Sequence, residues 1–191
     1  YLIKKVTITA QQNITTKYNE KAGIFVTLNH VRNNSEAIRG CVGFVMPDRI
    51  LYDAVINAAI ASANNDPRFK PVVKEELDGI TLEISVLTQP ELITVQDPRQ
   101  YKERIKVGRD GLIVQWRYGS GLLLPQVPIE YSWDEEHFLC ETCVKAGAMP
   151  DCWFYMDTKV YRFEAIVFKE VEPRGSVTRV HLDVKNAHNS C

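Results

Sequence analysis

One succession of hydrophobic patterns occurs twice along this chain, and that repetition constrains the fold more than any other feature. In the first half, a β-branched run at 23–28 and a strand-like run at 38–45 flank turn residues at 33–35, which predicts a hairpin. A stripe with helical spacing follows at 50–59, and residues 81–87 alternate as a strand. The predicted order is strand, strand, helix, strand.

The second half carries the same order. Residues 111–116 form a predicted strand, the glycine-rich segment 119–121 is the predicted hairpin turn, and 122–127 is the predicted partner strand. Pro125 makes that partner an edge or bulged strand, because proline donates no backbone hydrogen bond. A second helical stripe follows, and residues 160–167 then alternate as another strand.

Local signals mark where the two predicted helices begin and end. Asp48 is the predicted N-cap of the first helix, which ends before Pro67 because proline disfavours helical backbone in the residue before it. Ser132 and Glu135 have the spacing of a capping box at the start of the second helix. Gly147 is its predicted stop.

The duplicated order predicts an α+β fold with ββαβ-type repeats, a largely antiparallel sheet and flanking helices. We expect a single domain over residues 1–191. Its parts are a first repeat at 23–88, a connector at 89–110, a second repeat at 111–168 and a tail at 169–191.

Composition narrows the class of protein. The 23 basic and 24 acidic residues give a net charge of -1, which argues against a nucleic-acid partner. No apolar run approaches the roughly 20 residues of a membrane span, so no membrane partner is expected. Five cysteines without a regular framework favour a reducing cytosol. We expect a cytoplasmic protein, with residues 1–22 as a lead-in containing at most one short strand.

The segment from Arg39 to Gly43 is the leading candidate site. Gly40 and Gly43 bracket Cys41, and glycine within a strand marks a bulge or the close approach of a ligand or another backbone. Period-two alternation places Arg39 on the Cys41 face, where a guanidinium would favour the reactive thiolate. The alternative, a cysteine that packs as a small hydrophobe, stays open. His30 ends the predicted partner strand and is a candidate base for Cys41; the alternative is an exposed strand end.

Three further residues are candidates for binding. Asp66 and Arg68 follow the first helix. Asp66 would orient a substrate, and Arg68 would anchor an anion. The alternative is that both residues end the helix through local side-chain hydrogen bonds. Repeat register sets 38–43 opposite 122–127, so Gln126 would offer its amide at the same site as Cys41. The alternative is that Gln126 satisfies sheet backbone near Pro125.

A group of cysteines invites a metal site. His137, Cys140, Cys143 and Cys152 are zinc-ligand types, but three of them spread around a helix, and Cys143 falls on its apolar stripe. We therefore expect no metal, and no cofactor motif occurs. A Cys143–Cys152 disulfide or close thiol pair is the alternative use.

The segment Arg39-Gly40-Cys41-Val42-Gly43 resembles the RGC[IV]G signature of the AMMECR family. The resemblance extends over about residues 23–168, with Ile38 where members usually carry leucine. Its other landmarks are 23–28, 66–69, 84–87, 124–127 and 145–147. The resemblance implies one barrel-like sheet shared by two repeats. It also implies a helix ahead of the first strand, of which Tyr1-Leu2 would be the last turn.

The resemblance does not supply a reaction, because the family's activity is not established. Prokaryotic members are often encoded beside, or fused to, Memo-like and radical-SAM proteins, which makes those proteins expected partners by association. We expect an enzyme or enzyme-accessory protein with a thiol-containing cleft around Cys41, between the repeats, acting on a small-molecule or protein substrate. The alternative is a non-catalytic protein-binding module that acts with the same partners.

Overall fold

The computed structural model describes residues 18–33 and 35–182 and has an α+β fold. The chain forms two compact units. The first takes in Tyr1–Gln89 and Ile166–Val180, and the second takes in Pro90–Ala165 and His181–Cys191. The lead-in strand expected before residue 18 and the helix expected at Tyr1-Leu2 lie outside the described residues. No described helix is long and apolar enough to cross a membrane.

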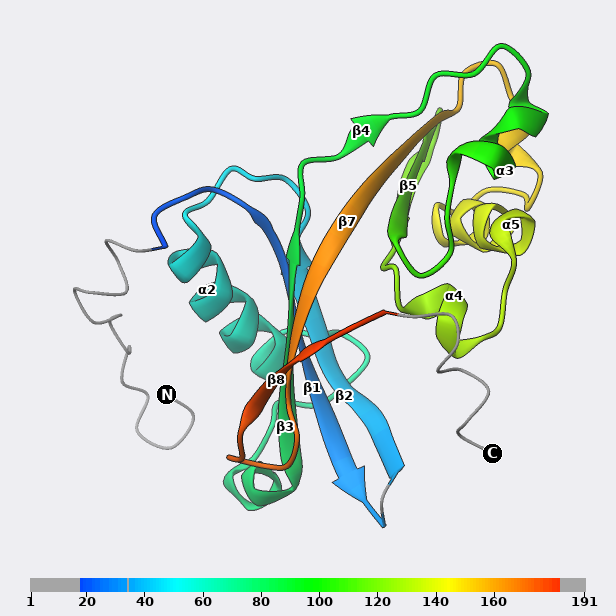
Figure 1. Cartoon of the computed structure of the whole chain (residues 1–191). Helices are drawn as coiled ribbons and strands as arrows, with labels where there is room; N and C mark the ends of the chain where they lie inside the picture. The colour runs from blue at the N-terminus through cyan, green and yellow to red at the C-terminus, as the bar shows by residue number, and fades with distance from the viewer. Residues whose placement is uncertain (1–17, 34, 183–191) are drawn as a thin grey trace. The chain divides into compact units, whose positions relative to one another are not determined.

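The first unit is built on three antiparallel strands. β1 (Gly23–Arg32) lies between β2 (Ser35–Phe44) and β3 (Ile80–Leu87), as Figure 1 shows. Both predicted strands of the hairpin and the predicted strand at 81–87 are confirmed. The turn after β1 holds Asn33 at a φ of 49°, a left-handed conformation that asparagine adopts more readily than most residues.

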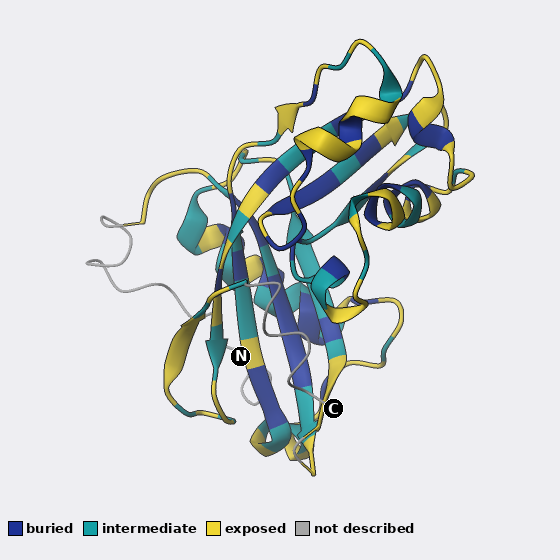
Figure 2. Ribbon diagram, turned by 45° about the vertical axis from the view of Figure 1, so that its right-hand side comes forward, coloured by how far each residue is buried: buried dark blue, intermediate teal, exposed yellow. Residues whose placement is uncertain are grey.

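The helix α2 (Leu51–Asn64) covers one face of this sheet. Ala54 and Ala58 on α2 are fully buried in a cluster with Ile24 and Val26 of β1, so the predicted apolar stripe is confirmed. Figure 2 shows this burial along the strands. Small alanines allow the helix and the sheet to approach closely.

The start of α2 corrects the predicted cap. The N-cap residue is Ile50 rather than Asp48, and no side-chain bond caps the helix. Backbone contacts hold this end instead: Ile50 forms an isolated bridge with Lys21, and the Leu51 N–H donates to the Glu20 carbonyl at 2.9 Å. Asp48 lies in the exposed turn before the helix.

The first unit is completed by a 3-10 helix and by the last part of a long strand. η1 (Lys74–Gly79) leads into β3. β7 (Lys159–Glu170) contributes its residues from Ile166 onward to this unit, where they pair with β8 (Val177–Val180). The Leu82 N–H donates to a Glu170 carboxylate oxygen at 2.9 Å.

The second unit has its own antiparallel strands. β5 (Asp110–Trp116) lies between β6 (Gly119–Leu123) and the first part of β7, and β4 (Glu91–Leu92) pairs with β7. The predicted strands at 111–116 and 160–167 are confirmed. In each half the elements follow in the order hairpin, helix, strand; that a duplication produced this order stays a prediction.

The second hairpin corrects its predicted turn. The turn is Arg117-Tyr118, and residues 119–121 belong to β6. Gly121 is required there because an added Cβ would collide with the backbone of Ala146 at the end of the following helix. β6 ends at Leu123, so residues 124–127 are not the predicted strand.

Two helices follow β6. α4 (Val127–Glu130) is one short turn, and α5 (Glu135–Lys145) is capped by Asp134, whose carboxylate accepts the His137 N–H at 2.8 Å. The predicted capping box is therefore wrong, because Ser132 adopts a φ of 54° and lies outside the helix. Gly147, with a φ of 75°, ends the helix as predicted.

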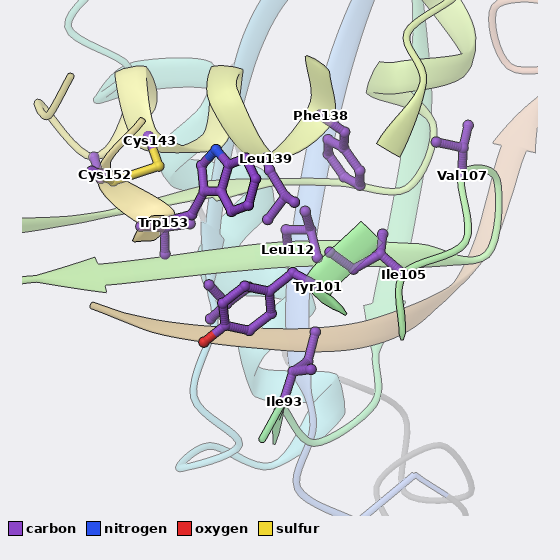
Figure 3. Close-up of a cluster of buried hydrophobic side chains, with 13 residues drawn as sticks. Ile93, Tyr101, Ile105, Val107, Leu112, Phe138, Leu139, Cys143, Cys152 and Trp153 are labelled. Atoms are coloured by element: carbon purple, nitrogen blue, oxygen red, sulfur yellow. A yellow bond between two sulfur atoms is a disulfide. The ribbon is translucent and has the colours of Figure 1, made fainter. Parts of the chain in front are cut away.

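A single cluster forms the core of the second unit (Figure 3). The buried α5 residues Phe138, Leu139 and Cys143 lie on the predicted helical stripe. The predicted connector 89–110 also enters this core through η2 (Pro98–Gln100), α3 (Tyr101–Arg104) and the residues around them. Its buried members are Ile93, Tyr101, Ile105 and Val107.

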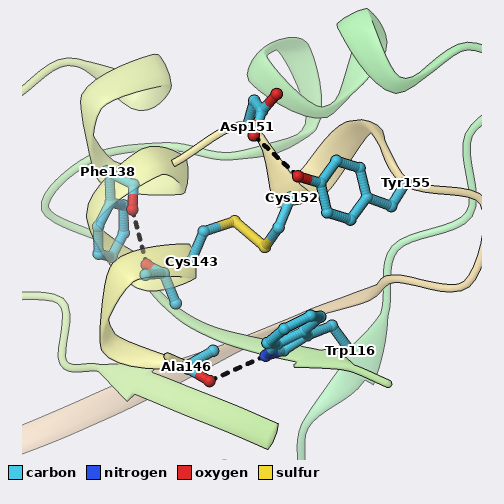
Figure 4. Close-up of a disulfide and its surroundings, with 8 residues drawn as sticks. Trp116, Phe138, Cys143, Ala146, Asp151, Cys152 and Tyr155 are labelled. Atoms are coloured by element: carbon cyan, nitrogen blue, oxygen red, sulfur yellow. Dashed lines mark hydrogen bonds between the residues drawn. A yellow bond between two sulfur atoms is a disulfide. The ribbon is translucent and has the colours of Figure 1, made fainter. Parts of the chain in front are cut away.

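A disulfide joins Cys143 of α5 to Cys152 of η3 (Cys152–Phe154), with the two Cα atoms 5.9 Å apart (Figure 4). Of the uses that the sequence left open for these two cysteines, the disulfide is the one observed. Cys140 is free. No group of three or more His, Cys, Asp or Glu in the described part of the chain is arranged to hold a metal ion.

Candidate functional site

The two glycines around Cys41 have packing partners. A Cβ at Gly40 would collide with the Ser62 carbonyl of α2, and a Cβ at Gly43 would collide with the Ile24 carbonyl and the Phe25 ring of β1. The predicted close approach of another backbone is therefore confirmed at both positions. These contacts explain the glycines of the motif without a ligand.

Ser62 fills the space that Gly40 leaves. Its hydroxyl accepts the Val42 N–H at 2.9 Å and lies 2.7 Å from the Val26 carbonyl and 2.8 Å from the Ala58 carbonyl, to either of which it can donate. Val26 and Val42 are paired residues of β1 and β2. The last turn of α2 thus places a hydroxyl between the two strands at the motif and fixes the backbone beside Cys41.

Arg39 lies in a β-bulge. Leu28 pairs with Gly40 and Asn29 pairs with Ile38, which leaves Arg39 as the extra residue of β2. A bulge re-aims side chains, so the period-two argument fails at this position. The Arg39 guanidinium forms two bonds with the Glu76 carboxylate of η1, at 2.7 and 3.0 Å, and its side chain is only 15% exposed.

Cys41 lies on the sheet face opposite α2. It pairs with Thr27, whose hydroxyl donates to the sulfur at 3.3 Å. Burial is the largest effect and raises the pKa of the Cys41 thiol, and the Asp66 and Glu83 carboxylates raise it further. Thr27 and Arg68 act in the opposite direction without reversing the shift of this pKa. The prediction that Arg39 favours the Cys41 thiolate is therefore wrong. With its pKa raised, the Cys41 side chain is a protonated thiol at neutral pH.

Asp66 and Arg68 do lie at Cys41. The buried Asp66 carboxylate accepts the Cys41 N–H at 2.8 Å, and the Arg68 guanidinium donates to it through Nε at 3.0 Å and through a terminal nitrogen at 2.7 Å. The Arg68 bonds, and after them the Cys41 N–H, hold the pKa of the Asp66 carboxyl far below its usual range. Asp66 thus ties the end of α2 to the backbone of the motif.

The Asp66–Arg68 pair has an internal counterpart. Asp97-Pro98-Arg99 repeats the sequence Asp-Pro-Arg, and it folds in the same way: Asp97 accepts the Arg99 N–H at 2.9 Å and the Arg99 guanidinium at 2.6 Å. This fold-back is therefore a local property of the three residues. The bond to the Cys41 N–H is what distinguishes the pair at the motif.

The sheet face around Cys41 is largely polar, with Phe25 and Leu87 among its apolar members, whereas the α2 face is apolar. Register places Thr27 and Glu83 in the same row as Cys41. Further polar residues on this face of β1 and β3 are Asn29, Thr81 and Ser85, all less than 9% exposed. The Thr81 hydroxyl is buried without a hydrogen-bond partner among the described residues. We call Cys41 and these five polar residues the Cys41 face.

Sequence reasoning missed Thr27, Thr81 and Glu83. Alternation on β3 does mark Thr81, Glu83 and Ser85 as one polar face, but such a face is normally interpreted as solvent-exposed. Burial of Thr27, Thr81 and Ser85 was the signal that only the structure supplies.

Two further candidates were His30 and Gln126. His30 is three residues from Thr27 on β1 and therefore on the opposite face, with its ring beside Gly79. Gln126 belongs to the second unit, where it is the N-cap residue of α4 rather than a strand residue. That Gln126 shares a cleft with Cys41 stays a prediction.

Known proteins resemble this chain over most of its length. The AMMECR1 family model matches residues 1–168. The Pyrococcus abyssi protein PYRAB00100 is 59% identical over 164 residues, which is 85% of this chain and 80% of the relative. The Methanocaldococcus jannaschii protein MJ0810 is 51% identical over 179 residues, which is 94% of this chain and 87% of the relative.

A solved structure shares the fold. The crystal structure of the uncharacterised protein PH0010 from Pyrococcus horikoshii superposes with a TM-score of 0.89 at 52% identity, covering 95% of this chain and 90% of that one. The matched region includes the whole motif from Arg39 to Gly43 and the Asp66–Arg68 pair beside it. This chain belongs to the AMMECR1 family.

Proposed function

We propose that this protein is a cytosolic enzyme or enzyme-accessory protein that acts at the Cys41 face. The observation that carries the proposal is the burial of hydroxyl and amide side chains around one free thiol. Buried polar groups cost free energy unless they bond a partner, and the Thr81 hydroxyl has none among the described residues. A polar ligand would supply such a partner.

The proposed role of Cys41 follows from its protonation. A protonated thiol is a proton donor, and it becomes a nucleophile only when its proton is removed. The Thr27 hydroxyl and the Arg68 guanidinium both favour the thiolate, so they would stabilise the charged sulfur at the moment it forms. Cys41 is the proposed acid or nucleophile, Thr27 and Arg68 its charge-stabilising neighbours, and Asp66 and Arg39 positioning residues.

Ligand capture tests the proposal. The protein is dialysed against the small-molecule fraction of a Methanocaldococcus jannaschii extract, because that organism holds a close relative. Bound compounds are then measured by mass spectrometry. We expect at least one compound that wild type retains and that Cys41→Ala and Thr27→Val lose.

Cys140→Ser is the matched control, because Cys140 is the other free cysteine among the described residues. It should retain the compound as wild type does. The proposal would be overturned if wild type retained no compound, or if Cys41→Ala retained the same compound to the same extent. Circular dichroism of each variant separates loss of binding from loss of fold.

A second candidate function is a protein-binding module, and one surface favours it. Residues Ser35–Ile38 of β2 are all exposed, and Ile38 is 50% exposed at an edge that pairs only with β1 in the described sheet. Exposed strand edges accept partner strands. The test is a pull-down with purified Memo-like and radical-SAM proteins. Binding that Cys41→Ala keeps and Ile38→Lys loses favours the module.

A further inference from the structure

An ion pair joins β2 to the end of β7 in the first unit. The Lys169 ammonium of β7 donates to a Glu36 carboxylate oxygen of β2, and the two side chains are 27% and 34% exposed. In the strand order β2, β1, β3, β7, two whole strands lie between these residues (Figure 1). We call this ion pair the strap.

The strap shows that this part of the sheet curls. Neighbouring strands lie about 4.8 Å apart, so three steps along a flat sheet would separate β2 from β7 by about 14 Å. Side chains stand roughly perpendicular to a sheet, and a lysine and a glutamate on a flat sheet would not meet across that distance. β2 and the end of β7 therefore bend toward each other over one face of β1 and β3.

The face that they bend over is the Cys41 face. Glu36 pairs with Val31, and Val31 is four residues from Thr27 on β1, so all three side chains project from the same side of the sheet. On β7, Lys169 shares its side with Val167, which is only 2% exposed. The strap thus spans the side of the sheet that carries the free thiol.

Burial on this face increases from β2 toward β7. Ile38, Asn29 and Thr81 form one row across β2, β1 and β3, and they are 50%, 7% and 0% exposed. The Thr81 hydroxyl, at the covered end of this row, has no hydrogen-bond partner among the described residues. Glu36 lies two residues from Ile38, so the strap crosses the face one row farther along β2.

The strands beside the strap are held more firmly than the strap itself. Next to Lys169, the Glu170 carboxylate accepts the Leu82 N–H of β3 at 2.9 Å, and Lys169 pairs with Thr178 in the ladder between β7 and β8. A single ion pair between partly exposed side chains contributes little to stability and is screened by salt. The ion pair can therefore break and re-form while the strands stay in place.

We propose that the strap controls access to the Cys41 face. When Lys169 and Glu36 are paired, they block the approach to Thr81. When the pair is broken, a polar molecule reaches that hydroxyl and the row beside it. The consequence for function rests on the ligand binding proposed above for the Cys41 face, but access to the face can be measured without a ligand.

Alkylation of a thiol placed beside the strap tests the proposal. Thr81→Cys puts that thiol where the hydroxyl without a partner lies, and iodoacetamide is a neutral reagent whose reaction peptide mass spectrometry follows. We expect Lys169→Met and Glu36→Gln each to accelerate alkylation at position 81 by about two- to fivefold. Sodium chloride at about 1 M should accelerate it only where the ion pair is intact.

The two variants separate access from acidity. Loss of the Lys169 charge alone would disfavour a nearby thiolate and slow alkylation, whereas loss of the Glu36 charge alone would favour the thiolate and speed alkylation. Acceleration in both variants is therefore the result expected of an open strap. The charge-reversed double variant Glu36→Lys/Lys169→Glu should restore the slow rate.

Lys102→Met is the matched control. Lys102 forms another lysine–glutamate pair, with Glu136 at 2.7 Å in the second unit, and its loss should leave the rate at position 81 unchanged. Urea denaturation of each variant confirms that the fold is retained. Alkylation of Cys41 in the same strap variants is a second readout that needs no substitution at position 81.

Two results would overturn the proposal: unchanged rates in both strap variants, or slower alkylation in Lys169→Met with faster alkylation in Glu36→Gln. The second result would mean that the charges act on the thiol and not on access. Failure of ligand capture by wild type, with faster alkylation in both strap variants, would remove the proposed function and leave the strap in place.

Discussion

The sulfur of Cys41 is subject to opposing effects from its neighbours. Burial and the carboxylates of Asp66 and Glu83 raise the pKa of the thiol, and Thr27 and Arg68 lower it by less. Arg68 is 53% exposed and also binds Asp66, so much of its charge is already compensated. The net result is a thiol with a guanidinium nearby that does not ionise it.

Removal of the Arg68 charge should therefore make Cys41 less reactive. Arg68→Gln removes a group that lowers the Cys41 pKa and leaves the Asp66 carboxylate, which raises that pKa. Because the thiolate is the species that reacts, alkylation of Cys41 by iodoacetamide at about pH 8 should slow by about three- to tenfold. Peptide mass spectrometry measures the rate at this one cysteine.

Arg99→Gln is the matched control for Arg68→Gln. Arg99 makes the same fold-back bonds to Asp97 within the same Asp-Pro-Arg sequence, but the pair carries no bond to Cys41. Alkylation of Cys41 should keep its wild-type rate in this variant. A Cys41 that reacts faster in Arg68→Gln would contradict the assigned balance of charges.

Gly40→Ala should destabilise the fold through a steric collision. The added methyl meets the Ser62 carbonyl of α2, and neither the helix backbone nor β2 can move without breaking the Ser62 bonds to the strands. We expect a loss of about 2–3 kcal/mol in the free energy of unfolding, measured by guanidinium denaturation. A stability equal to wild type would show that the helix end is not held against the motif.

At the scale of elements, the main role of Asp66 is to join α2 to β2. Its carboxylate accepts the Cys41 N–H of β2 two residues after the helix ends. The folded-state pKa of Asp66 lies below the unfolded value, so its contribution is present above the unfolded pKa and is lost as pH falls through the folded pKa.

Asp66→Asn should consequently cost stability in a pH-dependent way. At about pH 7 we expect a loss of about 2 kcal/mol, discounted from a fully buried pair because Arg68 is half exposed. The difference from wild type should shrink as the pH drops below about 4, where the unfolded carboxylate takes up its proton. Urea denaturation at several pH values measures it.

Asp97→Asn provides the control for that experiment. Asp97 makes the same local bonds at the surface and ties no second element. Its replacement should leave the midpoint of urea denaturation close to the wild-type value. A pH-independent loss in Asp66→Asn would mean that the carboxylate contributes through its shape and not through its charge.

Element order and core stripes were predictable from the sequence because they depend on local periodicity. The hairpin at 23–44, the α2 stripe around Ala54 and Ala58, and the strand at 81–87 all follow from spacing alone. Both predicted caps failed for physical reasons. Lys21 pairs with Ile50 from outside the helix, and the left-handed Ser132 leaves the capping of α5 to Asp134.

The candidate site was predictable in part for the same reason. The placement of Asp66 and Arg68 beside Cys41 follows from a helix that ends near its neighbouring strand. The direction of the Arg39 side chain could not be predicted, because a single extra residue in β2 changes where that side chain points. The burial of the Thr27 and Thr81 hydroxyls could not be predicted either, since alternation gives the face on which a residue lies and not what covers that face.

At the scale of the whole chain, each unit has its own hydrophobic core and its own bonds that hold one helix in place. The first unit uses Ser62 and Asp66 to hold the end of α2 against β2. The second uses the disulfide between Cys143 of α5 and Cys152 of η3. Substitutions that remove these bonds in one unit should therefore loosen that unit and leave the other unchanged.

Removal of the disulfide by substitution tests this separation. The bridge closes a short loop, with a sequence separation of 9, so the chain-entropy account gives it about 2.5 kcal/mol. Hydrogen exchange followed by mass spectrometry, with Cys143→Ser/Cys152→Ser compared with wild type, should show faster exchange in α5 and η3. Exchange in β1 and β2, and the alkylation rate of Cys41, should not change. Faster exchange at β2 would show instead that the disulfide stabilises both units, because the two hydrophobic cores would then unfold as one.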